Sequence, residues 1–339
     1  MPKKSWKIAI VGATGAVGGE LISILQERQF PVGSLQLLAS EKSVGKTIQF
    51  EGHDYPVEML GENSFQGTEI AFFSAGSELS KKFVPVAAKN GCVVIDNTAC
   101  FRMEADVPLV VPEVNPTSIA DYKKRNIIAN PNCSTIQLVV VLKALMCKTK
   151  IKRVVVSTYQ SVSGAGIEAM EELSKQTVAL FSQGAVDVKA FPHRIAFNCL
   201  PHIDIFLENG YTKEEWKLMQ ETSKILGTTV PLTATTVRVP VFYGHSESVN
   251  VEFASSLTPA EAREILRTAP GIEVIDDPLE NRYPLATEAA GQDPVYVGRI
   301  RQDTTVPFGL NMWIVADNIR KGAALNAVQV AEILIKEYL

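Results

Sequence analysis

The chain has 339 residues with 46% hydrophobic content, which suffices for a soluble core and indicates two domains of about 100–200 residues each. Its net charge of −4 argues against a nucleic-acid-binding groove, which would be basic. The N-terminus leads directly into an expected strand, without a signal peptide or an apolar run of about 18 residues, so we expect a cytosolic protein and no membrane span.

The first part of the chain alternates short apolar strands with helices. Strands are expected at residues 7–11, 35–39, 70–73, 93–95 and 127–129, and helices after Gly18 and over residues 77–89. This alternation is typical of a Rossmann-like, doubly wound parallel sheet that helices cover on both faces. The final segment, residues 322–339, has helical apolar spacing, and we expect this helix to return to the first domain.

Three glycines, Gly12, Gly15 and Gly18, follow the first expected strand and open the first helix. Glycines let the backbone turn tightly and approach a pyrophosphate, which the N-terminus of a helix stabilises. The spacing is G-x-x-G-x-x-G rather than the commoner G-x-G-x-x-G. Because the loop lies between a strand and a helix near the start of the chain, it predicts a dinucleotide site.

The end of the second strand bears on which dinucleotide is bound. An NAD site usually has an acidic residue there that holds the ribose hydroxyls, and Glu41 is available for that part. Ser40, Lys42 and Ser43 stand around it, and two hydroxyls with a lysine suit a 2′-phosphate. The sequence therefore favours NADP over NAD, with a solvated turn as the alternative interpretation.

The region after residue 133 has a different pattern. Strands are expected at residues 153–159, 237–243 and 249–254, and helices at residues 167–181 and 259–268. This order predicts an α+β domain that is built on a largely antiparallel sheet.

Five cysteines, at positions 92, 100, 133, 147 and 199, form no C-x-x-C pair, and their odd number argues against a disulfide framework or a zinc site. Cys92, Cys147 and Cys199 lie in apolar runs and are expected to be buried. Cys100 has no clear interpretation. Cys133 lies between an expected strand and an expected helix, where free N–H groups and the helix dipole favour the reactive thiolate. We therefore predict that Cys133 is a catalytic nucleophile.

Three residues at the ends of expected strands suit chemistry around such a thiol. Gln160 precedes a loop of small residues and can orient a carbonyl group. Arg238 offers a planar, two-pronged donor for a carboxylate. His245 follows a glycine, has a solution pKa near neutrality and is expected to be presented rather than buried, which suits acid–base work. Each residue alone is compatible with an ordinary loop or surface position, and only their sum with Cys133 favours a catalytic site.

Taken in order, these motifs strongly resemble those of the bacterial-type aspartate-semialdehyde dehydrogenases, and the resemblance covers essentially the whole chain. The motifs are residues 12–18, 96–102, 130–135, 160–166, 238–247, 317–318 and 321–324. The family often has serine and arginine where Ala99 and Lys42 stand. Because lysine is a point charge rather than a fork, we expect a weaker preference for NADP over NAD.

The resemblance implies a role for each matching residue. Cys133 would form the acyl-enzyme, His245 would be the acid–base group, and Gln160 would position the substrate. Arg238 would hold the substrate α-carboxylate, and Glu214 its amino group. The residues that would bind phosphate are Arg102, Lys217 and Asn132. The residues that would contact NADP are Gly12, Thr14, Gly15, Ala16, Val17, Ser40, Lys42, Ser43, Ser74, Ser163, Gly164 and Asn318. From sequence alone, Glu214 and Lys217 are interpreted as a solvated pair on one helix face.

The implied reaction is the NADPH-dependent reductive dephosphorylation of L-aspartyl-4-phosphate to L-aspartate-4-semialdehyde through a Cys133 thioester. It belongs to the biosynthesis of lysine, diaminopimelate, threonine, methionine and isoleucine. Residues 1–132 and 318–339 would form the NADP-binding domain, and residues 133–317 the catalytic and dimerisation domain. The expected assembly is a homodimer, with a tetramer as the alternative, and no metal is expected.

Two other functions remain open at this point. N-acetyl-γ-glutamyl-phosphate reductases also join a glycine loop to a catalytic cysteine, but their cysteine motif differs and they have no free amino group to recognise. A non-catalytic dinucleotide-binding protein would keep the same fold. The joint presence of Cys133, Gln160, Arg238 and His245 argues against this second alternative.

Overall fold

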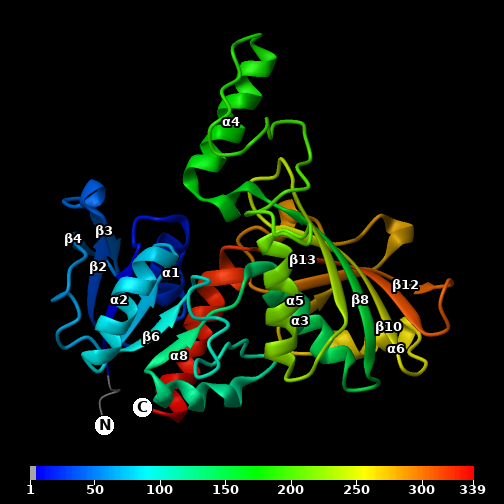
Figure 1. Cartoon of the computed structure of the whole chain (residues 1–339), viewed down its shortest axis with the longest axis horizontal. Coiled ribbons are helices and arrows are strands. Elements are labelled where there is room, and N and C mark those ends of the chain that lie inside the picture. Colours follow the sequence, from blue (N-terminus) through cyan, green and yellow to red (C-terminus); the bar gives the residue numbers. More distant parts are fainter. Residues whose placement is uncertain (1–4) are drawn as a thin grey trace. The chain divides into compact units, whose positions relative to one another are not determined.

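The computed structural model describes residues 5–339, which form two compact units (Figure 1). The first unit extends to Asn132 and also includes Ala323–Leu339, and the second is Cys133–Gly322. The chain leaves the second unit after Gly322 rather than after Asp317, because the side chain of Asn318 forms hydrogen bonds within the second unit.

The first unit contains a seven-stranded sheet in the order β3-β4-β2-β1-β5-β6-β7. Its strands are β1 (Trp6–Val11), β2 (Val32–Ala39), β3 (Thr47–Phe50), β4 (His53–Met59), β5 (Ile70–Phe73), β6 (Val93–Asp96) and β7 (Ile127–Ala129). All neighbours are parallel except β3 and β4. These two strands were not expected, because both are largely exposed and lack an apolar run.

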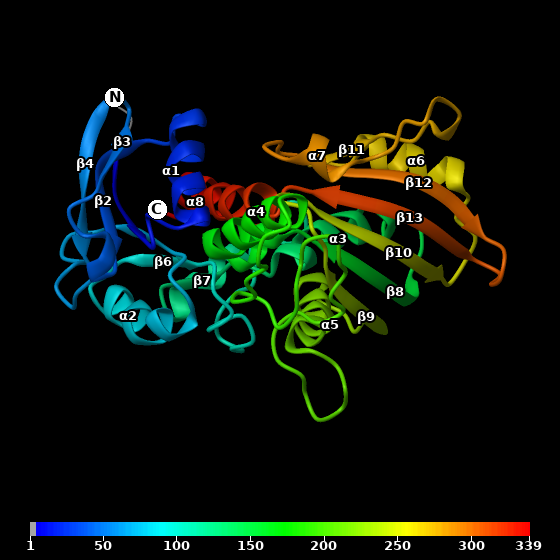
Figure 2. The ribbon, with the colours of Figure 1, turned by 90° about the horizontal axis from the view of Figure 1, so that it is seen from above.

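Helices cover both faces of this sheet (Figure 2). On one face α1 (Ala16–Glu27) packs beside α8 (Leu325–Glu337), and α2 (Ser77–Lys89) lies on the other face. Apolar side chains of α1 and α8 share one buried core with those of β1. The sheet is therefore doubly wound, and the C-terminal helix completes the first unit.

The register of the parallel strands brings their carboxyl ends to one edge of the sheet. Val11, at the end of β1, pairs with Leu38 of β2 and with Phe73 of β5. The glycine loop, residues 40–43 and Ser74 therefore follow neighbouring strands at the same edge. In open α/β sheets, ligands bind outside this edge.

The second unit contains a six-stranded sheet in the order β11-β12-β13-β10-β8-β9. Its strands are β8 (Ile151–Gln160), β9 (Leu232–Arg238), β10 (His245–Phe253), β11 (Ile272–Val274), β12 (Val295–Asp303) and β13 (Gly309–Ala316). The central pairs are antiparallel, whereas β9 and β11 join the edges in parallel. The expectation of a largely antiparallel sheet is confirmed.

The helices of the second unit are α3 (Cys133–Leu145), α4 (Ile167–Phe181), α5 (Lys213–Leu226), α6 (Pro259–Thr268) and α7 (Ala286–Ala289). α3 packs against α5, α6, β12 and β13. It is buried along almost its whole length, because nearly every residue except Lys143 is apolar or small. α4 projects away from the sheet of this unit (Figure 1).

Some local expectations were wrong. The strand expected over residues 237–243 ends at Arg238, and β10 begins at His245 rather than at residue 249, so that a loop separates them. Cys92 is buried as expected, but Cys147 and Cys199 are exposed. Both exposed cysteines lie in irregular segments outside any helix or strand, where apolar neighbours in sequence do not imply burial.

Candidate active site

The glycine loop of the first unit has a backbone that only glycine fits well. Gly12 has φ +89°, and a Cβ there would lie 3.0 Å from the Oγ of Ser74. A Cβ on Gly18 would lie 2.1 Å from the carbonyl oxygen of Gly12. The loop opens α1 at Gly15, whose position has no side-chain cap. A close backbone approach and an uncapped helix N-terminus both fit a dinucleotide pyrophosphate.

The other expected cofactor residues of the first unit gather around this loop. Thr14 Oγ1 lies 3.0 Å from Ser43 Oγ, so the glycine loop and the end of β2 are joined. Ser74 donates from Oγ to the carbonyl of Val11 over 3.1 Å. Ser40 and Lys42 are exposed near the same edge and are therefore available to a ligand.

Two of the expected phosphate-binding residues also belong to the first unit. Arg102 is buried and donates from Nε to the carbonyl of Asn130 and from Nη2 to the carbonyl of Asn97, each over 2.8 Å. Asn132 is buried directly before the chain enters α3. These bonds hold the Arg102 guanidinium in one orientation beside the segment that leads to Cys133.

Cys133 is the first residue of α3, in the second unit, and its side chain is half-buried while that of Ser134 is fully buried. The Oγ of Ser134 accepts a hydrogen bond from Gln160 Nε2 over 2.9 Å, which ties Gln160 to the first turn of this helix. A Cβ on Gly322 would lie 2.8 Å from the Cβ of Cys133. Position 322 therefore leaves no room for a side chain beside the thiol.

Strand register places three of the expected catalytic residues at one end of the second sheet. Gln160 of β8 pairs directly with Arg238 of β9. Ser246 of β10 pairs with Tyr159 of β8 in antiparallel orientation, so His245 lies one position further, at the same end as Gln160. A Cβ on Gly164 would lie 2.9 Å from Arg238 Nη1 and 3.3 Å from His245 Nε2, so both side chains reach the same loop.

Charged side chains beside Gln160 form a partly buried network, in which Glu214 is buried, Lys217 is half-buried and Asp204 is exposed. Lys217 donates from Nζ to Glu214 Oε2 over 3.1 Å and to Asp204 Oδ2 over 2.7 Å. Burial alone would lower the pKa of Lys217, but the two carboxylates outweigh it and raise this pKa. Glu214 Oε1 also accepts from Gln160 Nε2 over 3.4 Å. The solvated interpretation was wrong because α5 packs Glu214 against the sheet.

Arg238 is buried, and its Nη1 donates to the carbonyl of Ser161 over 2.8 Å. Burial lowers the pKa of Arg238, and the charges of Glu214 and Cys133 partly offset this effect. An arginine stays charged at neutral pH. The site therefore contains a fixed, desolvated cation, which suits the binding of a carboxylate.

His245 is fully buried, contrary to the expectation that it would be presented to solvent. It begins a central strand, and the Gln137 side chain of α3 donates to its carbonyl oxygen over 3.3 Å. Burial and the charge of Arg238 lower the pKa of His245 well below its usual value, so the ring is neutral at neutral pH. Its Nδ1 faces the N–H and Oγ of Ser161, each at 3.1 Å.

The sequence patterns did not predict that Ser134 and Ser161 belong to this site. Both immediately follow residues that were predicted, Cys133 and Gln160, and that adjacency was the only available signal. Asn318 was expected to contact NADP, but its side-chain oxygen accepts from Gly244 N and Ser161 Oγ, each over 3.0 Å. Its amide is thus engaged within the second unit.

A second set of polar side chains lies on the same three strands, two residues further from the end that carries Gln160, Arg238 and His245. Glu247 of β10 pairs with Thr158 of β8, and Thr158 pairs with Thr236 of β9. Glu247 is fully buried, and among the described residues neither of its carboxyl oxygens has a hydrogen-bond partner of ordinary geometry. Burial raises the pKa of Glu247 well above its usual range, with only partial offset by Gln137.

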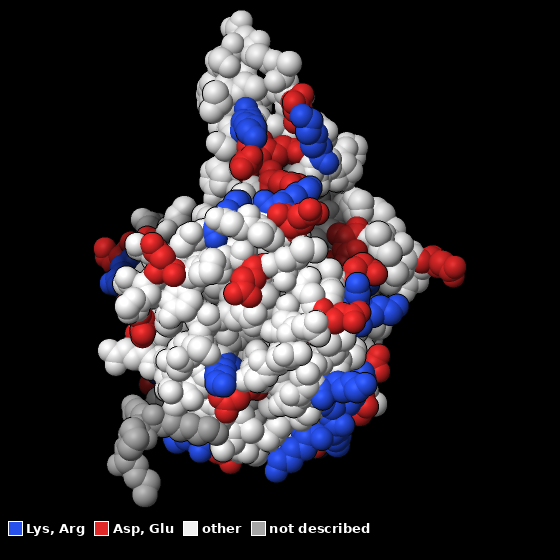
Figure 3. All heavy atoms as spheres, turned by 90° about the vertical axis from the view of Figure 1, so that its left-hand side faces the viewer, with Lys and Arg blue, Asp and Glu red and all other residues white. Residues whose placement is uncertain are grey.

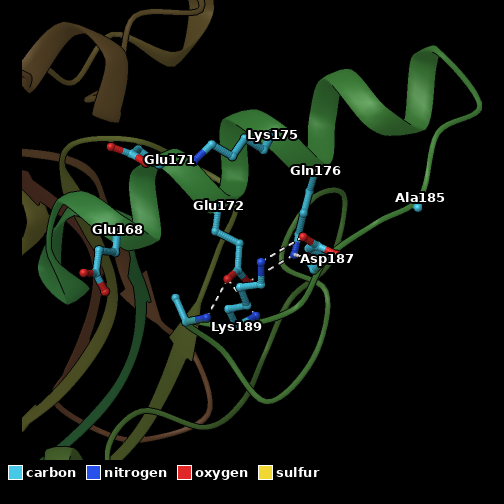
Figure 4. A pocket seen from close by; sticks show the side chains of 9 residues that line it. Glu168, Glu171, Glu172, Lys175, Gln176, Ala185, Asp187 and Lys189 are labelled. Atoms are coloured by element: carbon cyan, nitrogen blue, oxygen red, sulfur yellow. Dashed lines mark hydrogen bonds and ion pairs between the residues drawn. The ribbon is translucent and has the colours of Figure 1, made fainter.

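A separate hollow lies between α4 and the segment that follows it (Figure 4). Its polar groups are paired with one another, since Glu172 accepts from the backbone N–H groups of Lys189 and Ala190, and Gln176 donates to the carbonyl of Asp187. None of the expected catalytic residues lines it. These contacts fasten the projecting helix to its own return segment.

Among residues 5–339, no group of three or more His, Cys, Asp or Glu side chains is placed to hold a metal ion. In the same residues no helix has the length and apolar character needed to cross a membrane. On the face drawn in Figure 3, acidic and basic side chains lie close together in several places, between wide areas that carry neither.

Comparison with known proteins identifies relatives of the whole chain. A model of the semialdehyde dehydrogenase NAD-binding domain matches residues 7–122, and a model of the semialdehyde dehydrogenase dimerisation domain matches residues 142–321. The chain is 58% identical over 338 residues to an aspartate-semialdehyde dehydrogenase of Aquifex aeolicus, covering 98% of this chain and 99% of the relative.

Solved structures of aspartate semialdehyde dehydrogenases are also similar to nearly the whole chain. The crystal structure of aspartate semialdehyde dehydrogenase II from Vibrio cholerae, complexed with ASA, is 49% identical with a TM-score of 0.97 and covers 99% of this chain and 100% of its own. The aspartate semialdehyde dehydrogenase of Candida albicans, solved with NADP, is 26% identical with a TM-score of 0.76 and covers 98% of this chain and 99% of its own.

Proposed function

The chain belongs to the aspartate-semialdehyde dehydrogenase family, and from this premise we propose that it reduces L-aspartyl-4-phosphate to L-aspartate-4-semialdehyde with release of phosphate. The observation that carries this proposal is the gathering of Gln160, Arg238 and His245 at one end of the second sheet, next to the turn of α3 that begins with Cys133. The protein is an oxidoreductase of aspartate-derived amino-acid biosynthesis. A reductase for N-acetyl-γ-glutamyl phosphate is not favoured, since the matching relatives are aspartate-semialdehyde dehydrogenases.

Cys133 supplies the nucleophile in this proposal. Its sulfur attacks the acyl carbon, the bond from that carbon to the phosphate oxygen breaks, and a thioester forms. Covalent catalysis of this kind splits one difficult step into two easier ones. The half-buried thiol at the start of α3 supports the role, because backbone N–H groups of a first helical turn stabilise a developing oxyanion.

His245 moves the proton. Bound NADPH supplies the hydride that reduces the thioester. His245 accepts the thiol proton when Cys133 attacks, and returns it to the sulfur when the aldehyde leaves. The neutral state of the buried ring supports this role, because only a neutral imidazole accepts a proton.

The remaining polar residues bind the substrate. Arg238 holds the α-carboxylate, Glu214 the amino group and Gln160 the reacting carbonyl. The buried positions of Arg238 and Glu214 support these roles, since a desolvated charge binds its opposite strongly. Arg102, Asn132 and Lys217 bind the leaving phosphate. The Lys217 ammonium has three N–H donors, and its two carboxylate partners accept from two of them.

The dinucleotide is NADP in this proposal. The chain has an NAD-binding domain of the semialdehyde dehydrogenase type, and its glycine loop fits a pyrophosphate. Ser40, Lys42 and Ser43 bind the 2′-phosphate of NADP, and Ser163 and Gly164 lie against its nicotinamide. The relative from Candida albicans, which was solved with NADP, supports this choice.

The second unit, which contains Cys133, also forms the homodimer in this proposal. Residues 142–321 match a dimerisation domain, and the protein is a homodimer that acts on small-molecule substrates. We assign NADP binding to the first unit, and catalysis and dimerisation to the second, with residues 318–322 in the second unit and not in the NADP-binding part as expected from sequence. A biosynthetic role of this kind supports a cytoplasmic location.

One assay tests the proposed function directly. The purified protein should reduce NADP when aspartate semialdehyde and phosphate are both supplied, and should not do so when either is left out. N-acetylglutamate semialdehyde serves as the competing substrate. A faster reaction with that compound than with aspartate semialdehyde would refute the proposal.

A further inference from the structure

Asp96 is a fully buried carboxylate at the end of β6, in the first unit, and the proposed reaction does not use it. Its Oδ1 accepts from the backbone N–H of Thr98 and from Ser80 Oγ, each over 3.0 Å. Its Oδ2 accepts from Thr98 Oγ1 over 2.9 Å, and that hydroxyl oxygen accepts in turn from the N–H of Cys100 over 3.3 Å. Asp96 thus accepts from three donors, as an ionised carboxylate does.

One peptide unit joins Asp96 to Arg102. The N–H of Thr98 donates to Asp96, and the carbonyl oxygen of the same peptide is that of Asn97. This oxygen accepts from Arg102 Nη2 over 2.8 Å. In a planar trans peptide the N–H and the carbonyl point in opposite directions. The carboxylate of Asp96 therefore lies on one side of this peptide and the guanidinium of Arg102 on the other.

A peptide between two opposite charges is polarised by both of them. A carboxylate at its N–H and a guanidinium at its carbonyl each strengthen the hydrogen bond that the other makes. The two charges also interact directly. Burial raises the pKa of Asp96, and the hydrogen bonds from Thr98 and Ser80 and the charge of Arg102 act against this rise. Asp96 therefore stabilises Arg102 in the orientation that the Asn97 carbonyl defines.

The second carbonyl that holds Arg102 also depends on Asp96. Arg102 Nε donates to the carbonyl oxygen of Asn130 over 2.8 Å. The N–H of Asn130 donates to the carbonyl oxygen of Asp96 over 2.8 Å. Both residues that accept from the guanidinium, Asn97 and Asn130, are thus fixed by contacts with Asp96, one through its side chain and the other through its backbone.

We propose that Asp96 is a positioning residue that orients Arg102 through the peptide between Asn97 and Thr98 and so sets the affinity of the enzyme for phosphate. This inference rests on the proposed role of Arg102 in binding phosphate. A guanidinium that is held in place beforehand loses less conformational entropy when its ligand binds. Loss of the Asp96 charge should therefore weaken phosphate binding without weakening the binding of semialdehyde or NADP.

Kinetics of Asp96→Asn and the control Ser80→Ala test this assignment in the direction that consumes phosphate. Asparagine keeps the shape of the side chain but not its charge. In Asp96→Asn, KM for phosphate should rise about tenfold, the effect of one hydrogen bond to a charged group, with kcat and the other two KM values unchanged. Ser80→Ala removes a contact of Asp96 that is not part of the Arg102 peptide and should leave KM for phosphate unchanged. An unchanged KM for phosphate in Asp96→Asn, or an equal rise in all three KM values, overturns the proposal.

Arg102→Gln separates a failure of this inference from a failure of the proposed role of Arg102. If Arg102 does not bind phosphate, Arg102→Gln leaves KM for phosphate unchanged, and both proposals fall. If it does, this KM rises, and adding Asp96→Asn to the same protein should have no further effect, because Asp96 acts through Arg102. A further rise in the double variant would show that Asp96 acts by another route and would overturn this inference alone.

Thr98 offers a test that leaves Asp96 in place, should Asp96→Asn fail to fold. Thr98→Val removes the hydroxyl that joins Asp96 to the N–H of Cys100, and Thr98→Ser keeps it. Thermal melting with saturating NADP, with and without inorganic phosphate, measures phosphate binding without turnover. The stabilisation by phosphate should be smaller in Thr98→Val and restored in Thr98→Ser. Equal stabilisation of Thr98→Val and the unchanged protein overturns the proposal.

Discussion

Arg238 donates from Nη1 to the carbonyl oxygen of Ser161 over 2.8 Å, and the N–H of the same serine donates to His245. One peptide segment after β8 therefore orients both the proposed carboxylate clamp and the proposed proton carrier.

Cys133→Ser should lower turnover by more than about 10³-fold, as expected for loss of a covalent nucleophile. NADPH binding should be unchanged, because the glycine loop belongs to the first unit. Steady-state kinetics and fluorescence titration with NADPH measure the two effects. Cys199→Ser, at an exposed position in an irregular segment, is the matched control and should keep full activity. Substantial turnover by a clean Cys133→Ser preparation would remove the nucleophile assignment.

Arg238→Lys should raise KM for aspartate semialdehyde by about 10- to 100-fold, corresponding to the loss of a charge-assisted hydrogen bond. A lysine ammonium cannot hold the Ser161 carbonyl and a carboxylate in the geometry of a guanidinium fork. Initial-rate measurements with varied semialdehyde give this KM. Arg267→Lys, whose exposed guanidinium pairs with Glu264, is the control. An unchanged KM in Arg238→Lys would place the carboxylate site elsewhere.

Lys42→Ala should lower kcat/KM for NADPH by about tenfold, the effect of one lost contact to a charged group, and leave kcat/KM for NADH unchanged. Lys42 is exposed at the edge where the glycine loop and the end of β2 meet. The two values are obtained from parallel assays with each dinucleotide. Lys46→Ala, at a nearby exposed lysine, controls for general loss of charge. An equal decrease in kcat/KM for NADPH and for NADH would mean that Lys42 does not contact the 2′-phosphate.

Gly322→Ala should slow alkylation of the Cys133 thiol and cost about 1–3 kcal/mol of stability, as overpacking does. The added Cβ would lie 2.8 Å from the Cys133 Cβ, so one of the two must move. Iodoacetamide labelling and thermal melting measure the two effects. Gly19→Ala is the control, because a Cβ there meets nothing within 4 Å. Equal labelling rates in Gly322→Ala and the unchanged protein would show that a side chain at position 322 does not crowd the Cys133 thiol.

The difference in stability between the Glu247→Gln variant and the unchanged protein should favour the variant more at pH 8 than at pH 5. Burial raises the folded-state pKa of Glu247, so between the unfolded and folded pKa values the folded state holds more protons than the unfolded state. Stability of the unchanged protein then falls as the pH rises through that range. Glutamine removes this proton linkage. Melting temperatures of both proteins across pH 5–8 test it, and parallel curves would count against a protonated Glu247.

Much of the local structure follows from sequence patterns. The helices expected at residues 77–89, 167–181 and 259–268 have the observed bounds, because amphipathic spacing and end signals are local properties. The hairpin of β3 and β4 and the strands β12 and β13 were not predicted. Their pairing depends on partners elsewhere in the chain, which periodicity alone does not reveal.

By itself, the sequence determined the fold class, the glycine loop after β1 and the place of Cys133 at the start of a helix, since each depends on residues close together in the chain. Only the tertiary structure decided that Gln160 pairs with Arg238, that His245 is buried beside them, and that Ser161 contacts both. These contacts join residues tens of positions apart. They are set by strand register and by the packing of α3 and α5 on the sheet, which no local pattern encodes.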